Sequence, residues 1–216
     1  MKRVTLFTGH YGSGKSNLAV NYALSLREKG LKTALADIDI VNPYFRSADS
    51  RKELTEAGVR VVALPFANTN VDLPALPSEI YGLVERRDEY AVLDIGGDDR
   101  GALALGRFAP YILAENDYEM LFVANFYRPL TGTPEEALEV MREIEDAAGI
   151  RATGLVNNSN LGMDTTAEDV ERTEALIKAL SARSGLPVVF TSYDERLDPE
   201  PRVERAFPLK LQKKII

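Results

Sequence analysis

The stretch that decides the fold is VTLFTGHYGSGKS, residues 4–16. Its first part, Val4–Thr8, is apolar or β-branched and predicts a buried strand. Its second part, residues 9–16, matches G-x-x-x-x-G-K-[ST], the pattern of a phosphate-binding loop. An amphipathic pattern over Ser16–Glu28 follows directly and predicts a helix. A glycine-rich loop between a strand and a helix N-terminus is a ready-made site for phosphate groups.

The residue types in this loop match what phosphate binding requires. Glycines allow the backbone to adopt positive φ and to approach a phosphate closely, so that successive amides point inward. Lys15 is placed to reach the β- and γ-phosphates, and the Ser16 hydroxyl is placed to bind Mg²⁺. The predicted phosphate-binding loop (P-loop) and helix start consist of Gly9, His10, Tyr11, Gly12, Ser13, Gly14, Lys15, Ser16 and Asn17.

Short apolar runs alternate with longer amphipathic segments along the rest of the chain, a pattern typical of a parallel sheet covered by helices. The predicted strands are Val4–Thr8, Thr33–Asp37, Arg60–Leu64, Tyr90–Asp94, Met120–Asn125, Ala152–Val156 and Val188–Thr191. The predicted helices are Ser16–Glu28, Ser47–Ala57, Ser78–Arg87, Gly101–Glu115 (interrupted by Pro110), Pro134–Ala148 and Thr165–Ser184. We therefore predict one α/β domain over residues 1–216, with a doubly wound, mostly parallel sheet and helices on both faces.

The amino-acid composition excludes several kinds of catalytic and metal-binding site. The chain has 216 residues, a net charge of −7, no cysteine and one histidine, which excludes thiolate nucleophiles, cysteine-held clusters and multi-histidine metal sites. The acidic balance argues against nucleic acid as a partner. The N-terminal apolar run is too short for a signal peptide, so we expect a cytoplasmic protein.

Acidic residues follow the second and fourth predicted strands, at the sheet edge where ligands bind in parallel α/β folds. Asp94 closes one apolar strand and is a candidate Mg²⁺ ligand, directly or through water. Gly97 is the second of two consecutive glycines in the loop that follows, and it allows that loop to approach a γ-phosphate and to offer a backbone amide. Asp37 and Asp39 point to opposite sides if the chain is extended, so one can orient the metal's water shell and the other the attacking water.

GHYGSGKS, DIDIVNP after the second strand and VLDIGG after the fourth resemble the MinD/ParA group of P-loop ATPases, which includes CobQ/CobB-type proteins. The resemblance extends over nearly the whole chain. It implies ATP and ADP as nucleotides, Mg²⁺ as the metal, and a homodimer that forms when ATP is bound. It also implies that Lys15 and Ser16 bind phosphate and metal, that Asp39 positions the hydrolytic water, and that Asp37 and Asp94 lie near the metal.

The base-binding residues are likewise implied by the resemblance: Asn157 matches the asparagine that contacts adenine, and Ser192 and Tyr193 match the segment that covers the base. The absence of an N-K-x-D motif favours ATP over GTP. One departure concerns His10, which stands where members of the group commonly carry a signature lysine that reaches the partner's phosphate.

Two functions fit these residues. The first is a nucleotide-dependent switch that hydrolyses ATP and acts on a protein client the sequence does not identify. The second is a small-molecule kinase or an ATP-dependent ligase similar to dethiobiotin synthetase, in which Arg46 and Arg100 would hold an anionic acceptor. A third, a nucleotide-binding scaffold without turnover, is disfavoured by Asp39. The tail over residues 207–216 contains Pro208, which leaves only a weak membrane-binding helix, and is expected to pack along the domain or along a partner instead.

Overall fold

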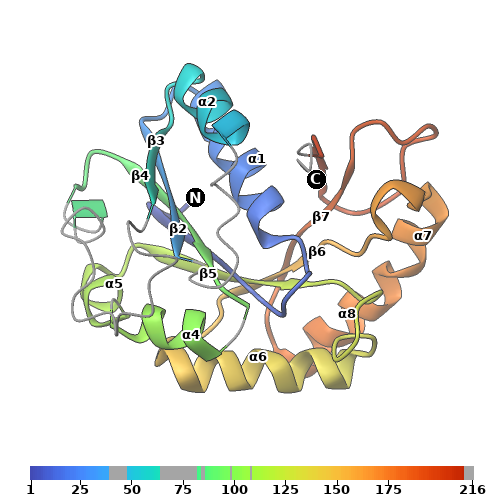
Figure 1. Ribbon diagram of the computed structural model, residues 1–216. Coiled ribbons are helices and arrows are strands. Elements are labelled where there is room, and N and C mark those ends of the chain that lie inside the picture. The colour runs from blue at the N-terminus through green and yellow to red at the C-terminus, as the bar shows by residue number, and fades with distance from the viewer. Residues whose placement is uncertain (39–47, 64–81, 84–85, 98, 108, 212–216) are drawn as a thin grey trace.

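The computed structural model describes residues 1–38, 48–63, 82–83, 86–97, 99–107 and 109–211. Within these residues, eight parallel strands form one sheet in the order β3-β2-β4-β1-β5-β6-β7-β8 (Figure 1). The strands are β1 (Val4–Thr8), β2 (Thr33–Ile38), β3 (Arg60–Ala63), β4 (Tyr90–Ile95), β5 (Tyr118–Ala124), β6 (Gly154–Asn157), β7 (Val188–Asp194) and β8 (Ala206–Leu209). The predicted α/β class is confirmed, and the sheet is fully parallel.

Helices cover both faces of the sheet, α1 and α2 on one and α4, α5, α6 and α8 on the other (Figure 1). The helices are α1 (Lys15–Glu28), α2 (Ala48–Glu56), α4 (Asp99–Gly106), α5 (Ala109–Glu115), α6 (Pro134–Ala148), α7 (Ala167–Arg172) and α8 (Glu174–Ser184). A short 3₁₀ turn, η2 (Gly162–Asp164), precedes α7. Where it is described, the chain contains no helix long and apolar enough to cross a membrane.

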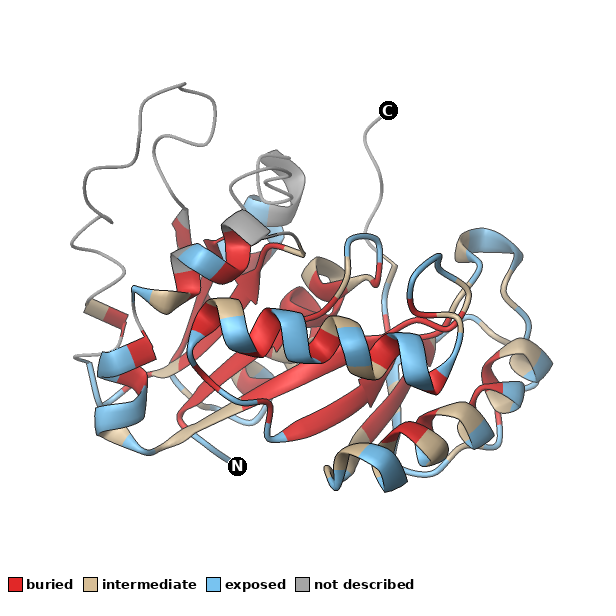
Figure 2. Cartoon of the chain, turned by 90° about the horizontal axis from the view of Figure 1, so that it is seen from below, coloured by how far each residue is buried: buried red, intermediate tan, exposed pale blue. Residues whose placement is uncertain are grey.

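Two apolar clusters hold the layers together, one on each face. Seen from below, a helix with buried and exposed residues along its length runs across a sheet whose strands are largely buried (Figure 2). Met141 and Ile144 of α6 belong to the cluster on the face covered by α4, α5, α6 and α8. Leu18 and Leu26 of α1 belong to the cluster on the opposite face. Strands buried on both faces explain why their sequences are continuous apolar runs rather than alternating ones.

Two predicted helices are each split in the structure. The expected helix over Gly101–Glu115 is α4 followed by α5, and Pro110 lies in the first turn of α5, where a missing N–H is tolerated. The expected helix over Thr165–Ser184 is α7 followed by α8. The break is at Thr173, whose buried hydroxyl donates to Val170 O at 2.7 Å and accepts from a side chain at the end of β6. Most of the predicted helix Ser78–Arg87 lies outside the described residues.

Strand β8 was not predicted from the sequence, because Pro208 interrupts the apolar pattern of this strand. The strand pairs with β7 at the edge of the sheet, the place where a strand proline is tolerated. The chain then continues along α1, where Asn21 donates to Lys210 O at 3.0 Å and accepts from Lys210 N at 2.9 Å. Of the two expected arrangements of the tail, packing along the domain is therefore the one observed as far as residue 211; residues 212–216 lie outside the described part.

Candidate nucleotide-binding site

The loop between β1 and α1 has the backbone conformation that its glycines predict. Gly9, Gly12 and Gly14 have φ values of 142°, 77° and 88°. A Cβ on Gly9 would lie 2.5 Å from Val123 O, and one on Gly14 would overlap the side-chain amide of Asn158. Glycine is therefore required both for the backbone angles and for the close packing of the loop against β5 and the end of β6.

The N-terminus of α1 is left open, in contrast with those of α6 and α7. Its N-cap is Gly14, no side chain caps the first turn, and no acidic residue lies there. In α6 the capping box of Thr133 and Glu136 occupies the same position, and in α7 that of Thr166 and Asp169. The first-turn amides and the positive end of the α1 dipole are thus directed at the P-loop, as an anion-binding site needs.

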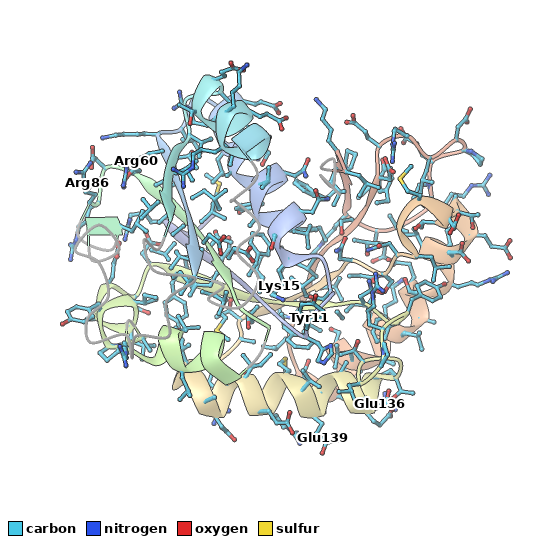
Figure 3. The ribbon with its side chains drawn as sticks, viewed as in Figure 1. Tyr11, Lys15, Arg60, Arg86, Glu136 and Glu139 are labelled. Carbon is cyan, nitrogen blue, oxygen red and sulfur yellow. The ribbon has the colours of Figure 1, made fainter. Side chains whose placement is uncertain are left out.

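Lys15 and Gly97 meet at this loop. The Lys15 side chain is buried, and its Nζ donates to His10 O at 3.2 Å. Gly97, in the loop after β4, lies so close that a Cβ there would be 2.6 Å from Tyr11 N and 2.7 Å from Lys15 Nζ. Figure 3 shows Tyr11 and Lys15 together at the turn between β1 and α1. The loop after β4 therefore packs directly against the side chain of the P-loop lysine.

Two buried carboxylates lie side by side next to the loop. Asp37 of β2 and Asp94 of β4 are direct register partners and are 4% and 0% exposed. By the alternation of strand side chains they share the face of Leu35 and Val92, which pack in the cluster with α1. The pair thus lies on the α1 side, at the edge where α1 begins. Asp39, the predicted water-positioning residue, is outside the described residues.

The residues present fit a nucleotide bound with Mg²⁺. Ser13 is 1% exposed, and its buried hydroxyl has no hydrogen-bond partner in the described parts of the chain, so a polar group inside the P-loop is left for a ligand. Lys15 supplies positive charge for phosphates, and the Asp37–Asp94 pair supplies the oxygen ligands that Mg²⁺ prefers. No cluster of three or more possible metal ligands occurs among the described residues.

Asn157, the predicted adenine contact, lies at the end of β6 with its side chain fully buried. Its Nδ2 donates to Thr173 Oγ1 at 2.9 Å, and its Oδ1 accepts from Ser159 Oγ at 2.7 Å. Both ends of the amide are therefore engaged within the protein, and the side chain joins the end of β6 to the junction of α7 and α8.

Asn158, the next residue, contacts the P-loop directly. Its Nδ2 donates to Ser13 O at 2.6 Å, and its Oδ1 accepts from Ser192 Oγ at 2.7 Å. Ser192, predicted to lie over the base, is buried and also donates to Asn157 O at 3.1 Å. A continuous hydrogen-bonded chain thus connects β7, β6 and the P-loop and fixes the loop in place.

The loop after β7 carries a second polar arrangement. Tyr193, also predicted near the base, is buried, and this burial, with a smaller contribution from Glu200, raises the pKa of its phenol. The neighbouring Asp194 accepts from Arg196 Nε at 2.9 Å, and this hydrogen bond is the main cause that lowers the pKa of Asp194. Arg196 also reaches Met163 Sδ at 3.5 Å, which links this loop to η2. At neutral pH the site therefore has a neutral Tyr193 and an ionised Asp194.

Sequence reasoning missed two neighbours of the P-loop, Asn158 and Arg128. The side chain of Arg128, in the turn after β5, lies 3.8 Å from the position of a Cβ on Gly12. Both residues follow strands that end at the ligand-binding edge of a parallel sheet, and this position is the signal that could have found them.

The P-loop, the parallel sheet and the acids at its edge define the class: the chain has the P-loop nucleoside triphosphatase (NTPase) fold. No family model and no curated protein matches the sequence. Among solved structures, the cell division protein FtsY from Thermotoga maritima is similar with a TM-score of 0.65 and 17% identity, over 91% of this chain and 63% of that one. Chloroplast FtsY from Physcomitrella patens is similar with a TM-score of 0.63 and 17% identity, over 94% of this chain and 62% of that one.

A third similar structure is the signal recognition particle receptor FtsY from Elizabethkingia anophelis in complex with GDP, with a TM-score of 0.57 and 17% identity. That match covers 89% of this chain and 57% of the other. The chain thus spans about three fifths of the length of these structures. The likeness establishes the P-loop NTPase fold. FtsY is a different branch from the MinD/ParA group that the sequence motifs resemble, so the comparison does not support that finer assignment.

Proposed function

We propose that this chain binds ATP with Mg²⁺, hydrolyses it to ADP and phosphate, and acts as a nucleotide-dependent switch of the MinD/ParA type. The observation that carries the proposal is the position of Gly97. The loop after β4 lies against Lys15 Nζ and Tyr11 N, where the terminal phosphate of a nucleotide on the P-loop would be expected. A phosphate there would replace His10 O as the hydrogen-bond acceptor of the Lys15 ammonium. It would also contact the Gly97 loop, which precedes α4 in the chain.

Each group at the site has a distinct proposed role in phosphate binding, metal binding or hydrolysis. Lys15 and the α1 amides bind the phosphates and stabilise the negative charge that develops during phosphoryl transfer. Ser16, Asp37 and Asp94 hold Mg²⁺, which when bound neutralises phosphate charge. Asp39 is proposed to orient the attacking water, a role that rests on the sequence resemblance.

ATP is the proposed nucleotide because no N-K-x-D motif is present. A guanine nucleotide is the second candidate, since one structure with a similar fold is a complex with GDP. Competition between unlabelled ATP and GTP for a fluorescent nucleotide analogue separates the two. The kinase or ligase alternative depends on Arg46 and Arg100, whose side chains lie outside what the structure describes, and no described contact favours it.

The proposed switch includes a homodimer that forms with ATP and presents a surface to a protein client. In an Asp39→Ala variant the bound ATP should persist, because the water-positioning carboxylate is gone. Light scattering is expected to give a mass of 23.8 kDa with Mg-ADP and twice that mass with Mg-ATP. The same 23.8 kDa mass with both nucleotides, when ATP is shown to be bound, would reject the dimer.

Gly97→Ala tests the switch loop. The new Cβ would lie 2.6 Å from a backbone nitrogen and 2.7 Å from Lys15 Nζ, so that the loop must move away from the lysine. We expect kcat for phosphate release to fall by about 10- to 100-fold, in line with the cost of misplacing groups by about 1 Å in an active site. ADP affinity, which does not need this loop, should change little in calorimetric titrations.

Gly82→Ala is the matched control, because no heavy atom lies within 4 Å of a Cβ at Gly82. It should keep wild-type turnover. If Gly97→Ala also kept wild-type turnover, the proposed contact between the β4 loop and the terminal phosphate would be wrong.

A further inference from the structure

The turn after β5 is rigidly built. Asn125, fully buried at the start of the turn, accepts the N–H of Arg128 at 3.1 Å and the Thr131 hydroxyl at 2.8 Å through its backbone oxygen. Thr131 N donates in turn to Arg128 O at 3.3 Å, and Tyr127 N donates to Asn125 Oδ1 at 3.0 Å. Both backbone polar groups of Arg128 are therefore fixed by neighbours, which holds its Cα in one position.

Two longer contacts anchor the same turn to the rest of the site. Phe126 N donates to Ser159 Oγ at 3.0 Å, in the loop after β6. The Tyr127 hydroxyl donates to Asp169 O at 2.9 Å, in α7. The backbone that carries Arg128 is thus held from β5, β6 and α7 together.

The Arg128 side chain extends from this turn over the P-loop. Its Cδ and Nε both lie 3.8 Å from the position of a Cβ on Gly12. The side chain is exposed. Within the described residues its guanidinium donates to no carboxylate or carbonyl. Arg60 and Arg172, in contrast, each pair with a carboxylate. An arginine that has no acidic partner in the described parts of the chain, and whose backbone is held beside a phosphate-binding loop, has its hydrogen-bond donors available for an anion.

Two segments flank the same part of the P-loop. Gly97 lies against Tyr11 N and Lys15 Nζ, and Arg128 lies against Gly12, the residue after Tyr11. His10 also lies in the P-loop, and its Nδ1 is 2.9 Å from Tyr11 O. The terminal phosphate of a nucleotide bound at Lys15 and the Gly97 loop would therefore lie close to the Arg128 side chain.

We propose that Arg128 is a phosphate-binding residue that contacts the terminal phosphate of a bound nucleoside triphosphate and so favours triphosphate over diphosphate. The proposal rests on the nucleotide binding proposed above. The planar fork of guanidinium donors matches the oxygens of a phosphate group, and this match distinguishes arginine from lysine. A diphosphate lacks the group that Arg128 contacts, so its affinity should depend little on this side chain.

The test is a set of calorimetric titrations on Arg128→Ala and Arg128→Lys with Mg²⁺ present. The probes are ADP and the non-hydrolysable imidodiphosphate analogue of ATP, or their guanine counterparts if wild type binds those more tightly. For Arg128→Ala we expect the triphosphate Kd to rise by about tenfold or more, the usual effect of losing a charge-assisted hydrogen bond. The diphosphate Kd should rise by less than about threefold, and Arg128→Lys should lie between wild type and Arg128→Ala.

Arg142→Ala is the matched control, because Arg142 is an exposed arginine in the second half of α6. It should leave both affinities unchanged. Equal losses of triphosphate and diphosphate affinity in Arg128→Ala would overturn the contact with the terminal phosphate. Unchanged triphosphate affinity would overturn the inference while leaving nucleotide binding intact, whereas absence of binding in folded wild type would overturn the proposed function itself. Arg128→Lys keeps the comparison available if the alanine variant does not fold.

Discussion

Lys15→Ala is expected to lower kcat/KM for phosphate release from Mg-ATP by at least about 100-fold, the scale found when a key charge-stabilising donor is removed from an active site. Lys15 is almost fully buried, and its ammonium lies between the P-loop carbonyl of His10 and the loop at Gly97. Alanine removes this buried positive charge and leaves the α1 amides and the proposed Arg128 contact as the remaining donors. Steady-state phosphate release at several ATP concentrations measures the effect.

The control for this variant is Lys29→Ala, since Lys29 is an exposed lysine at the other end of α1. It should retain wild-type kcat/KM, and circular dichroism should show that both variants are folded. If Lys15→Ala kept more than half of the wild-type value, phosphate release would not occur at this loop.

Asp94→Asn is expected to produce the second large effect, a fall in kcat of about 100-fold together with a higher Mg²⁺ concentration for half-maximal activity. The substitution keeps the shape of a fully buried side chain but removes its negative charge. Its register partner Asp37 would then be the remaining carboxylate of the pair. Phosphate release over a range of Mg²⁺ concentrations separates weaker metal binding from a loss of turnover at saturating metal.

Asp88→Asn is a suitable control, because Asp88 is an exposed acid paired with Lys32 at 2.6 Å, at the opposite edge of the sheet from the P-loop. Its Mg²⁺ dependence should match that of wild type. An unchanged Mg²⁺ dependence in Asp94→Asn would mean that the carboxylate pair of β2 and β4 does not hold the metal.

Much of the fold could be predicted because the signals are local. The strands around the P-loop are continuous apolar runs, and Gly9, Gly12 and Gly14 carry the positive φ angles that the loop motif requires. The alignment of Asp37 with Asp94 follows from the parallel topology, in which strand ends meet at one edge.

The remaining features depend on contacts between segments far apart in the sequence. The break between α7 and α8 involves the hydrogen bond from Asn157 to Thr173, which no helical periodicity reveals. The contact between Asn158 and Ser13 joins residues 145 positions apart, and the approach of Arg128 to Gly12 is similarly long-range. Tertiary packing decides such contacts, and sequence patterns identify only the strand ends from which they come.

The choice between nucleotide-binding families shows a related limit. GHYGSGKS and VLDIGG describe a P-loop and the strand next to it, which resemble the MinD/ParA group. The similar solved structures named above are FtsY proteins at 17% identity, which share the fold. Short motifs report the chemistry of the phosphate site, whereas base specificity, oligomeric state and partner choice depend on residues that vary between branches.

The most direct test of the central claim is calorimetric titration of the unmodified chain with the non-hydrolysable ATP analogue, with and without Mg²⁺. We predict one saturable site per chain, tighter with Mg²⁺ than without it, and lost in Lys15→Ala. No measurable binding of either the adenine or the guanine analogue to folded protein would contradict the claim that this P-loop is a nucleotide-binding site.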